Sequence, residues 1–205
     1  SHDEVVHGKK SIIDKMPGSY EEKFSSVRLL LGYMMSHPGK KLNFMGYEIG
    51  QFTEWNHEKE IEWFMLNYEY HRKLNYYIKK LNDFYLQYSE LWEVDYSWDG
   101  FKWIASDDFE KNIIVFKRID KNGNELITVA NFSPIQRENY AIGVNDGIYY
   151  EIFNSNNQEY GGTGIGNKGK IISSFLPMHD YDSSISLTVP PLSIIFFKKH
   201  RTYNI

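Results

Sequence analysis

The spacing of hydrophobic residues changes in the middle nineties of the chain. Before that point apolar residues recur every three or four positions, and after it they fall in short runs separated by turn residues. The first spacing is typical of amphipathic helices and the second of antiparallel strands. The pattern therefore predicts two parts: residues 1–95, with helices and short strands, and residues 96–205, with strands only.

Two helices are predicted in the first part. Ser19 and Glu22 have the spacing of a capping box, and apolar residues follow at helical intervals from position 24 to position 34. This predicts a helix over residues 19–36 that is ended by the Pro-Gly pair at 38–39. Apolar residues between positions 70 and 88 indicate a second, longer amphipathic helix.

Between these helices, residues 41–45 (KLNFM) are too few for a helix and lie between two glycines, which predicts a buried strand. Glu48 stands just past the end of that strand, before a polar and aromatic loop. The order of helix, strand and helix resembles one and a half units of a (β/α)₈ barrel, whose active site lies at the carboxyl ends of its strands. On that arrangement Asp3 and Glu48 emerge from neighbouring strands, roughly 5 Å apart at the backbone.

The second part has the regular spacing of short strands that is typical of a β-sandwich. Asn122-Gly123 is its clearest hairpin turn, because these residues adopt positive φ angles at low cost. The expected strands are residues 101–106, 112–118, 126–131, 149–154, 170–175, 185–189 and 194–198.

A glycine-rich stretch at residues 161–170 matches two phosphate-binding patterns by letter. Both patterns require a helix directly after the glycines, because the helix N-terminus holds the phosphate. A strand-like run follows here, and Ile171 stands where the P-loop has a Ser or Thr. We therefore expect a long surface loop in place of a nucleotide site.

Metal motifs are incomplete. Glu4 and His7 have the Glu-x-x-His spacing of di-iron bundles without a second copy, and His57-Glu58 begins a zincin motif that Ile61 breaks. We expect no metal and no cofactor, and we interpret His57 as a loop hydrogen-bonding residue.

Composition narrows the class of protein. Of 205 residues, 41% are hydrophobic and 24% charged, and 23 Lys and Arg against 27 Asp and Glu give a net charge of -4 without a basic block. This argues against nucleic-acid binding. No apolar run approaches the roughly 20 residues of a membrane span, and there is no cysteine or leader, so a cytoplasmic protein is expected. The chain begins without Met, as a processed or truncated piece would.

The first nine residues carry more titratable groups than a solvated face requires. They include Asp3, Glu4, His7 and Lys9 and end next to a glycine. A charged terminal tail is the alternative to a functional cluster. The placement of this cluster before the helix and strand described above favours the functional interpretation.

Several motifs together resemble one family. In order along nearly the whole chain, they are similar to the C-terminal part of bacterial glycogen (1,4-α-glucan) branching enzymes of the α-amylase superfamily. The motifs are HDEVVHGK (residues 2–9), KMPG (15–18), GYM (32–34), HPGKK (37–41), FMGYEIGQ (44–51), EWNH (54–57), NFSP (131–134) and YGGTG (160–164).

The resemblance implies an α/β part followed by an all-β part. Residues 1–95 would be the last βα units of a (β/α)₈ barrel, from the end of strand seven to helix eight, and residues 96–205 a C-terminal antiparallel β-sandwich. It implies that Asp3 is a catalytic carboxylate that stabilises the transition state, and that His2 binds the sugar in the first subsite. Glu4 follows the branching-enzyme form of the motif, and Glu48 and Gln51 lie in the loop after strand eight.

The implied reaction is a retaining transfer of an α-1,4-glucan chain to a 6-hydroxyl, without a cofactor. In the family, the nucleophile and the general acid lie before the start of this chain, so the fragment alone is expected to be inactive. Two alternatives remain open. One is a non-catalytic glucan-binding β-sandwich module, and the other is a debranching or hydrolysing relative.

Two further expectations concern surfaces. Trp55 and Trp63 could stack on sugar rings or pack the loop against the rest of the fold, with Trp55 the better candidate for stacking. Barrel units separated from their barrel would expose apolar faces. We expect that the first part pairs with the missing part of the enzyme, self-associates or rearranges.

Overall fold

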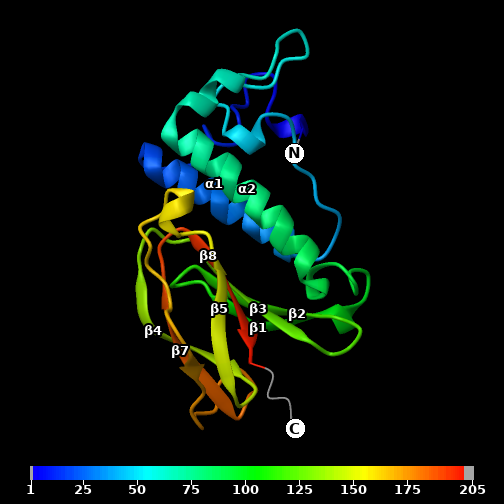
Figure 1. The fold of residues 1–205 in the computed structure, drawn as a ribbon, viewed down its shortest axis with the longest axis vertical. Helices are drawn as coiled ribbons and strands as arrows, with labels where there is room; N and C mark the ends of the chain where they lie inside the picture. The colour runs from blue at the N-terminus through cyan, green and yellow to red at the C-terminus, as the bar shows by residue number, and fades with distance from the viewer. Residues whose placement is uncertain (1, 201–205) are drawn as a thin grey trace.

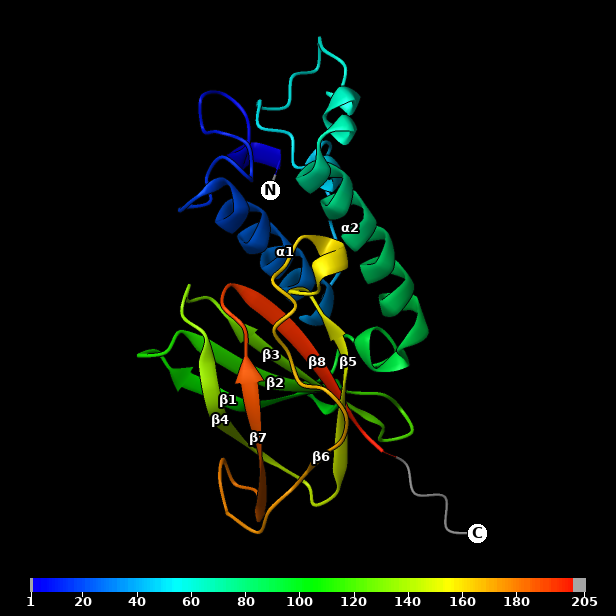
Figure 2. The ribbon, with the colours of Figure 1, turned by 60° about the vertical axis from the view of Figure 1, so that its left-hand side comes forward.

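The molecule has four layers, as seen in a computed structural model that describes residues 2–200 and, for His2, the backbone only. Loops formed by residues 2–18 and 46–68 lie at one end, farthest from the sheets, and the segment at residues 37–45 runs between that end and the sheets (Figure 1). Two long helices form the next layer, and a six-stranded sheet and a two-stranded sheet follow (Figure 2). No helix among the described residues combines the length and hydrophobicity needed to cross a bilayer.

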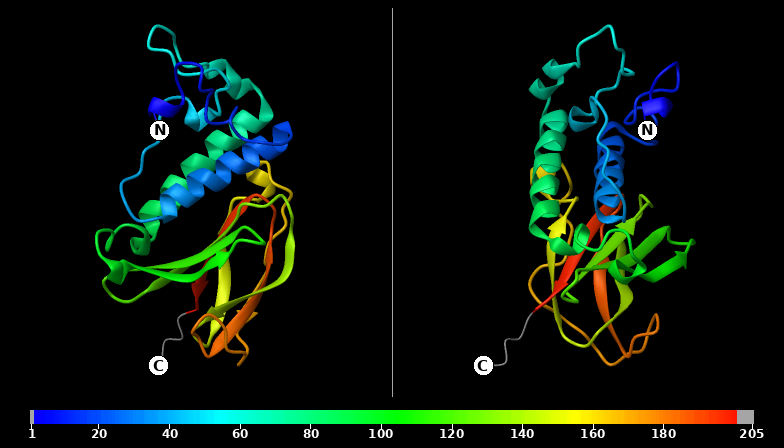
Figure 3. Two further views of the ribbon diagram at one scale, coloured as in Figure 1. Left: turned by 180° about the vertical axis from the view of Figure 1, so that it is seen from behind. Right: turned by 90° about the vertical axis from the view of Figure 1, so that its right-hand side faces the viewer.

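Both predicted helices are confirmed. Helix α1 spans Tyr20–Ser36 and helix α2 spans Glu69–Gln87. The capping box of α1 is complete: the Ser19 hydroxyl accepts from the Glu22 amide at 3.3 Å, and the Glu22 carboxylate accepts from the Ser19 amide at 2.6 Å. Each bond satisfies an amide that has no partner within the helix. The two helices pack side by side across the six-stranded sheet (Figure 3).

The remaining elements are short helical turns and strands. The 3₁₀ turns are η1 (His2–Glu4), η2 (Tyr47–Ile49), η3 (Trp63–Asn67), η4 (Ser89–Leu91), η5 (Trp98–Gly100) and η6 (Gln158–Tyr160). The strands are β1 (Phe101–Asp108), β2 (Ile113–Ile119), β3 (Glu125–Asn131), β4 (Arg137–Val144), β5 (Ile148–Asn154), β6 (Ile171–Ile172), β7 (Ser183–Val189) and β8 (Ser193–Lys199).

The predicted buried strand over residues 41–45 is wrong. These residues form an irregular segment in which Leu42 is 51% and Met45 is 53% exposed. A strand requires a neighbouring strand to take its backbone hydrogen bonds. Within residues 2–100 of the described chain there is no strand that could do so. Consequently Asp3 and Glu48 do not follow strands; they lie in the turns η1 and η2.

The antiparallel β-sandwich is confirmed, with one strand that the sequence analysis missed. The larger sheet has the order β1-β2-β3-β8-β5-β6, and β4 pairs with β7 in the smaller one. Strand β4 was missed although Tyr140, Ile142 and Val144 alternate there. All three are buried, but the polar residues before them and Gly143 between them interrupt the pattern. The predicted strand at residues 170–175 is reduced to the two residues of β6.

Neighbouring residues on β3 and β8 serve two different hydrophobic cores, because side chains alternate across a strand. One face of the six-stranded sheet packs against the helices, and the other packs against β4 and β7. Ala130, Ile194 and Phe196 belong to the helix side. Val129 and Phe197 belong to the sandwich side. The six-stranded sheet is therefore covered on both faces, and the helical layer is part of the same packed structure.

The glycine-rich stretch is a loop, as predicted, with a defined conformation. Side chains of strand β5 and of its neighbours hold it: Asn154 Nδ2 donates to the Ile165 carbonyl at 3.0 Å, and the Asn167 amide donates to the Glu151 carboxylate at 2.8 Å. A side chain at Gly162 would meet the Asn156 carbonyl oxygen at 2.1 Å. Close packing of backbone on backbone thus accounts for a glycine at this position.

Candidate functional site

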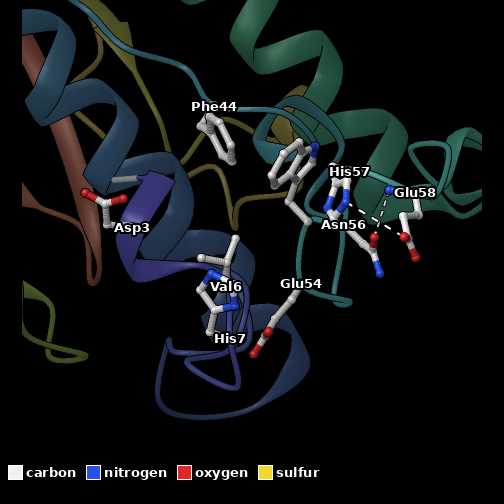
Figure 4. Close-up of a pocket in the computed structure, with 9 residues that line it drawn as sticks. Asp3, Val6, His7, Phe44, Glu54, Asn56, His57 and Glu58 are labelled. Atoms are coloured by element: carbon white, nitrogen blue, oxygen red, sulfur yellow. Dashed lines mark hydrogen bonds and ion pairs between the residues drawn. The ribbon is translucent and has the colours of Figure 1, made fainter.

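A cavity of about 580 Å³ lies among the loops at the end of the molecule farthest from the sheets. The residues that line it are Asp3, Val6, His7, Phe44, Glu54, Trp55, Asn56, His57 and Glu58. Figure 4 shows Asp3 on one side and Asn56, His57 and Glu58 on the other, with Val6 and His7 between them. The fold thus brings the N-terminal cluster next to the EWNH loop, which is more than 40 residues away in the chain.

Glu54 joins the two loops. Its carboxylate accepts from the Lys10 amide at 2.6 Å through Oε1 and from the Gly8 amide at 2.9 Å through Oε2. These two bonds lower the pKa of Glu54 below its ordinary value, because they stabilise the charged form. Glu54 therefore remains ionised, and both bonds are kept, in mildly acidic solution.

The N-terminal loop is shaped to receive this carboxylate. His7, Gly8 and Lys10 have positive φ angles of 59°, 81° and 70°. Successive residues of such backbone direct their amides toward one side and form a concave anion site. A glycine at position 8 fits this geometry without strain. The glycine was visible in the sequence, but the distant carboxylate that it serves was not.

Trp55 is half-buried at the cavity wall. Its ring packs edge-on against Phe44, with 5.4 Å between the ring centroids, and lies 6.3 Å from the His57 ring. This contact supports the packing interpretation of Trp55. The residue also lines the cavity, so part of its surface remains available to a ligand.

The ionisable side chains of the cavity are mainly exposed. The His57 and Glu58 side chains are each 77% exposed, with 3.9 Å between His57 Nε2 and Glu58 Oε1. Asn56 Oδ1 accepts from the Glu58 amide at 2.8 Å. Asn56, and not His57 as predicted, therefore makes the hydrogen bond that shapes this loop.

The predicted site residues are only partly brought together. Asp3 and Trp55 line the cavity, whereas Glu4 and Glu48 do not. Glu4 is 68% exposed at its side chain and pairs with Lys9 at 3.2 Å. The Glu48 backbone carbonyl accepts from an Asn75 side chain of helix α2.

Three other predicted residues have different surroundings. The side chain of His2 lies outside the described part of the chain. Trp63 is 52% exposed on η3 and does not line the cavity. Gln51 is buried and has a structural contact: its Oε1 accepts from the Glu62 amide at 2.9 Å. This bond fixes the beginning and the end of the loop that carries Glu54 and Trp55.

Among the described residues, no group of three His, Asp or Glu is placed to hold a metal ion. The lining combines carboxylates, imidazoles and an amide with two aromatic rings. Such a set can donate to and accept from the hydroxyl groups of a sugar, while the rings contact its apolar face. Glu54 and Phe44 stood out in the sequence only as letters of two motifs, and His7 only as a member of the N-terminal cluster and of an incomplete metal motif. Their contribution follows from loops that meet only in the folded chain.

Comparison with known proteins identifies relatives of the whole chain and of its second part. Residues 103–200 match the model of the alpha amylase C-terminal all-beta domain. A 1,4-alpha-glucan branching enzyme of Halothermothrix orenii is 52% identical over 97% of this chain. One of Aquifex aeolicus is 50% identical over the same share. The chain spans about a third of each of these relatives, 32% in both cases.

Solved structures show a related fold at low sequence identity. Ttha1563 of Thermus thermophilus has a TM-score of 0.61 at 15% identity and covers 92% of this chain, which matches 33% of that protein. A debranching enzyme of Nostoc punctiforme has a TM-score of 0.57 at 14% identity and covers 85% of this chain, which matches 31% of that protein. In both cases the likeness extends across the helical layer as well as the sandwich.

Proposed function

We propose, on the premise that this chain is homologous to the 1,4-alpha-glucan branching enzymes, that it is part of an enzyme that builds α-1,6 branches into α-1,4-glucan. One observation carries the proposal. A chain about half identical to such enzymes places Asp3 and the EWNH loop around one cavity of about 580 Å³, large enough for sugar units. The debranching alternative has only a likeness of fold, at 14% identity.

The proposed reaction is a retaining transfer in two steps. A carboxylate nucleophile attacks the anomeric carbon, the α-1,4 bond breaks, and a general acid gives its proton to the leaving O4. The 6-hydroxyl of a second glucan then attacks the glycosyl-enzyme, and its proton passes to the same general acid, now acting as a base. The nucleophile and the general acid belong to the two-thirds of the relatives' length that this chain does not match.

In this reaction Asp3 would be the third carboxylate. Its negative charge, on the wall of the cavity, would stabilise the positive charge that develops on the sugar ring in the transition state. The imidazoles of His7 and His57 and the amide of Asn56 would hold substrate hydroxyls. Trp55 would contact a sugar ring with the part of its face that Phe44 leaves uncovered.

The first 95 residues would complete a (β/α)₈ barrel in the whole enzyme. Leu42 and Met45, each about half exposed here, stand in the segment that would become a barrel strand once a neighbouring strand is available. Exposed apolar side chains of this kind favour association with a partner surface. We propose that the remainder of the enzyme is that partner, and that it covers Leu42 and Met45.

The experiment is a branching assay on the whole enzyme, with amylose as substrate and the iodine-stain change as readout. Asp3→Asn should lower the rate at least about a thousandfold, as expected for a carboxylate acting on a developing charge. Glu4→Gln is the matched control, because Glu4 is an adjacent exposed carboxylate outside the cavity. The proposal is refuted if the whole enzyme hydrolyses amylose without forming branches, or if its Asp3→Asn variant keeps the wild-type rate.

A further inference from the structure

The segment that carries Asp3 is held to the rest of the fold by few apolar contacts. Of residues 3–10, Val5 is buried and Val6 is half-buried, whereas the other six residues are exposed. A segment with so little buried apolar surface separates from the rest of a protein at a low free energy. The position of Asp3 therefore depends on the polar contacts of this segment.

Two of these contacts come from Glu54, in the opposite loop. Figure 4 shows the Glu54 side chain directed toward the N-terminal loop at His7. Both of its carboxylate oxygens are used there, one by the Gly8 amide and the other by the Lys10 amide. The backbone of Lys9, which lies between these two amides, is thereby fixed on both sides.

The side chain of Lys9 extends this connection to the turn η1. Its Nζ donates to the Asp3 carbonyl oxygen at 2.9 Å and to Glu4 Oε1 at 3.2 Å. Hydrogen bonds from a charged donor are stronger than those between neutral groups. Glu54 thus fixes the backbone of Lys9, and the Lys9 side chain in turn fixes the backbone of Asp3.

The loop that carries Glu54 is better anchored than the segment that it holds. Gln51, at the start of this loop, is buried. Its Oε1 accepts from the Glu62 amide at 2.9 Å, and its Nε2 donates to the Thr53 carbonyl oxygen at 3.3 Å. Support therefore runs from the core through Gln51 and Glu54 to the exposed N-terminal loop.

The proposed role of Asp3 depends strongly on its placement. Asp3 would stabilise a charge that develops only in the transition state, and a displacement of about 1 Å can lower the rate of such a step about a hundredfold. Lys9 does not line the cavity, and Glu54 lines it with both oxygens bound to backbone amides. Both residues can therefore affect the reaction through Asp3 without binding the substrate.

We infer that Glu54 and Lys9 are positioning residues, which place Asp3 on the wall of the cavity by holding the backbone of the N-terminal loop. That Asp3 acts in glucan transfer rests on the proposed function. That Glu54 and Lys9 hold η1 rests on the contacts themselves, so the two statements can be tested separately.

The first test concerns structure and uses the full 205-residue chain. In Glu54→Gln and in Lys9→Met, the heteronuclear NOE of the Asp3 amide should fall toward the values of an unstructured chain, although neither substitution alters η1 itself. Lys10→Gln is the matched control, because it removes a charge from the same loop and keeps the backbone amide that Glu54 binds. An unchanged NOE in both variants overturns the inference, whatever reaction the enzyme catalyses.

The second test is the branching assay on the whole enzyme. Glu54→Gln and Lys9→Met should each lower kcat about tenfold to a hundredfold and leave KM for amylose within about twofold, because the placement of Asp3 matters in the transition state. Lys9→Arg keeps a charged donor and should retain most of the rate. Glu60→Gln is the control for Glu54→Gln: Glu60 is an exposed carboxylate of the same loop outside the cavity, and its variant should keep the wild-type kcat and KM.

A double variant tests whether Glu54 acts through Asp3. In the Asp3→Asn enzyme, the added Glu54→Gln should lower the residual rate less than about twofold, because the carboxylate that Glu54 places is already absent. A further loss as large as in wild type, or a rise in KM at unchanged kcat, overturns the inference. Either result would show that Glu54 acts on the substrate or on the fold directly. Lys9 is exposed, so Lys9→Met retains a test if the Glu54 variant fails to fold.

Failure of this inference is distinguishable from failure of the proposed function. If the wild-type enzyme forms no branches, or if Asp3→Asn keeps its rate, the proposed function fails, and the NOE of the Asp3 amide still decides whether Glu54 and Lys9 hold η1. If Asp3→Asn is inactive while Glu54→Gln and Lys9→Met are fully active, the inference alone fails.

Discussion

Arg28 Nε donates to the Ser155 carbonyl oxygen at 2.9 Å and so ties helix α1 to the segment that follows β5. Arg28 is 1% exposed, its Nη1 has no hydrogen-bond partner among the described residues, and burial lowers its pKa to about 10. A buried cation without a carboxylate partner is unfavourable in itself. The arginine is therefore a costly link between the helical layer and the sandwich.

This relationship predicts that the size of the side chain at position 28 matters more than its charge. Arg28→Met should keep the free energy of unfolding within about 1 kcal/mol of wild type, because the loss of hydrogen bonds is offset by removal of the buried charge. Arg28→Ala also leaves a cavity, so it should lower the free energy of unfolding by about 3 kcal/mol. Urea unfolding measures both. Equal destabilisation by the two variants would show that the hydrogen bonds dominate.

We expect the hydrogen bonds of Glu54, which join the two loops of the cavity, to depend on pH. Its pKa is lowered in the folded state, so the bonds to Gly8 and Lys10 are present above the ordinary pKa of a glutamate and are lost as the pH falls through the lowered value. The amide proton shifts of Gly8 and Lys10, followed by NMR, should move at that lower pH.

A matched pair of variants separates this effect from general acid unfolding. Glu54→Gln should abolish the pH-dependent shift changes, because the glutamine side chain does not titrate. It also accepts hydrogen bonds through its single oxygen only. Glu58→Gln, in the same cavity without bonds to those amides, should leave the titration as in wild type. If the Gly8 and Lys10 shifts titrate equally in both variants, Glu54 is not the group that holds the loop.

Two glycines of the glycine-rich loop should differ in their tolerance of a side chain. Gly162→Ala would place a Cβ 2.1 Å from the Asn156 carbonyl oxygen, which forces the loop to move and should lower the free energy of unfolding by about 2–3 kcal/mol. At Gly169 nothing lies within 4 Å of such a Cβ. Gly169→Ala should therefore lower the free energy of unfolding by only about 1 kcal/mol, because of the positive φ of 75°. Thermal or urea unfolding of both variants measures the difference, and an equal loss would argue against close packing at Gly162.

We expect the stability of the protein to rise at alkaline pH because of Lys41. Burial lowers its pKa to about 8, and nearby Asp95 only partly opposes this effect. At neutral pH the lysine is charged in both states and the folded state is destabilised. Between about pH 8 and the ordinary lysine value of 10.5, the folded protein binds fewer protons than the unfolded chain, so stability increases with pH.

The melting temperature measured from about pH 7 to about pH 10 checks this expectation. Lys41→Met should flatten the rise, because the titrating group is removed. Lys40→Met is the control, because Lys40 is exposed and a hydrogen bond with Tyr96 raises its pKa. If the melting temperature of Lys41→Met still rises with pH, a group other than Lys41 causes the rise.

Local sequence signals predicted most of the fold, because the forces involved act over a few residues. The Ser19–Glu22 box began helix α1 where it was expected, and alternation identified seven of the strands. The Asp120–Asn124 turn was found from its Asn-Gly pair. However, only Gly123 of that pair has a positive φ, and Asn122 instead donates its amide to the Asp120 carboxylate.

The predictions that failed or were absent depend on residues distant in the chain. The segment at residues 41–45 has the composition of a strand, but without a neighbouring strand its backbone has no partner and Leu42 faces solvent. Strand β4 was missed because polar residues and Gly143 interrupt its alternation, and only its pairing with β7, far along the chain, marks it as a strand. Asp3 and Trp55 were singled out by motif and resemblance, whereas Glu54 acquires its contact only when the loop reaches Gly8.

The sequence by itself therefore determined the helices and most strands, because each rests on local periodicity, and its motifs in order pointed to the relatives that the comparisons found. The tertiary structure alone decided which of the marked residues share a cavity and that Glu54 binds the N-terminal loop. Those facts depend on hydrogen bonds and burial between segments far apart in the chain, and no local pattern encodes which segments will meet.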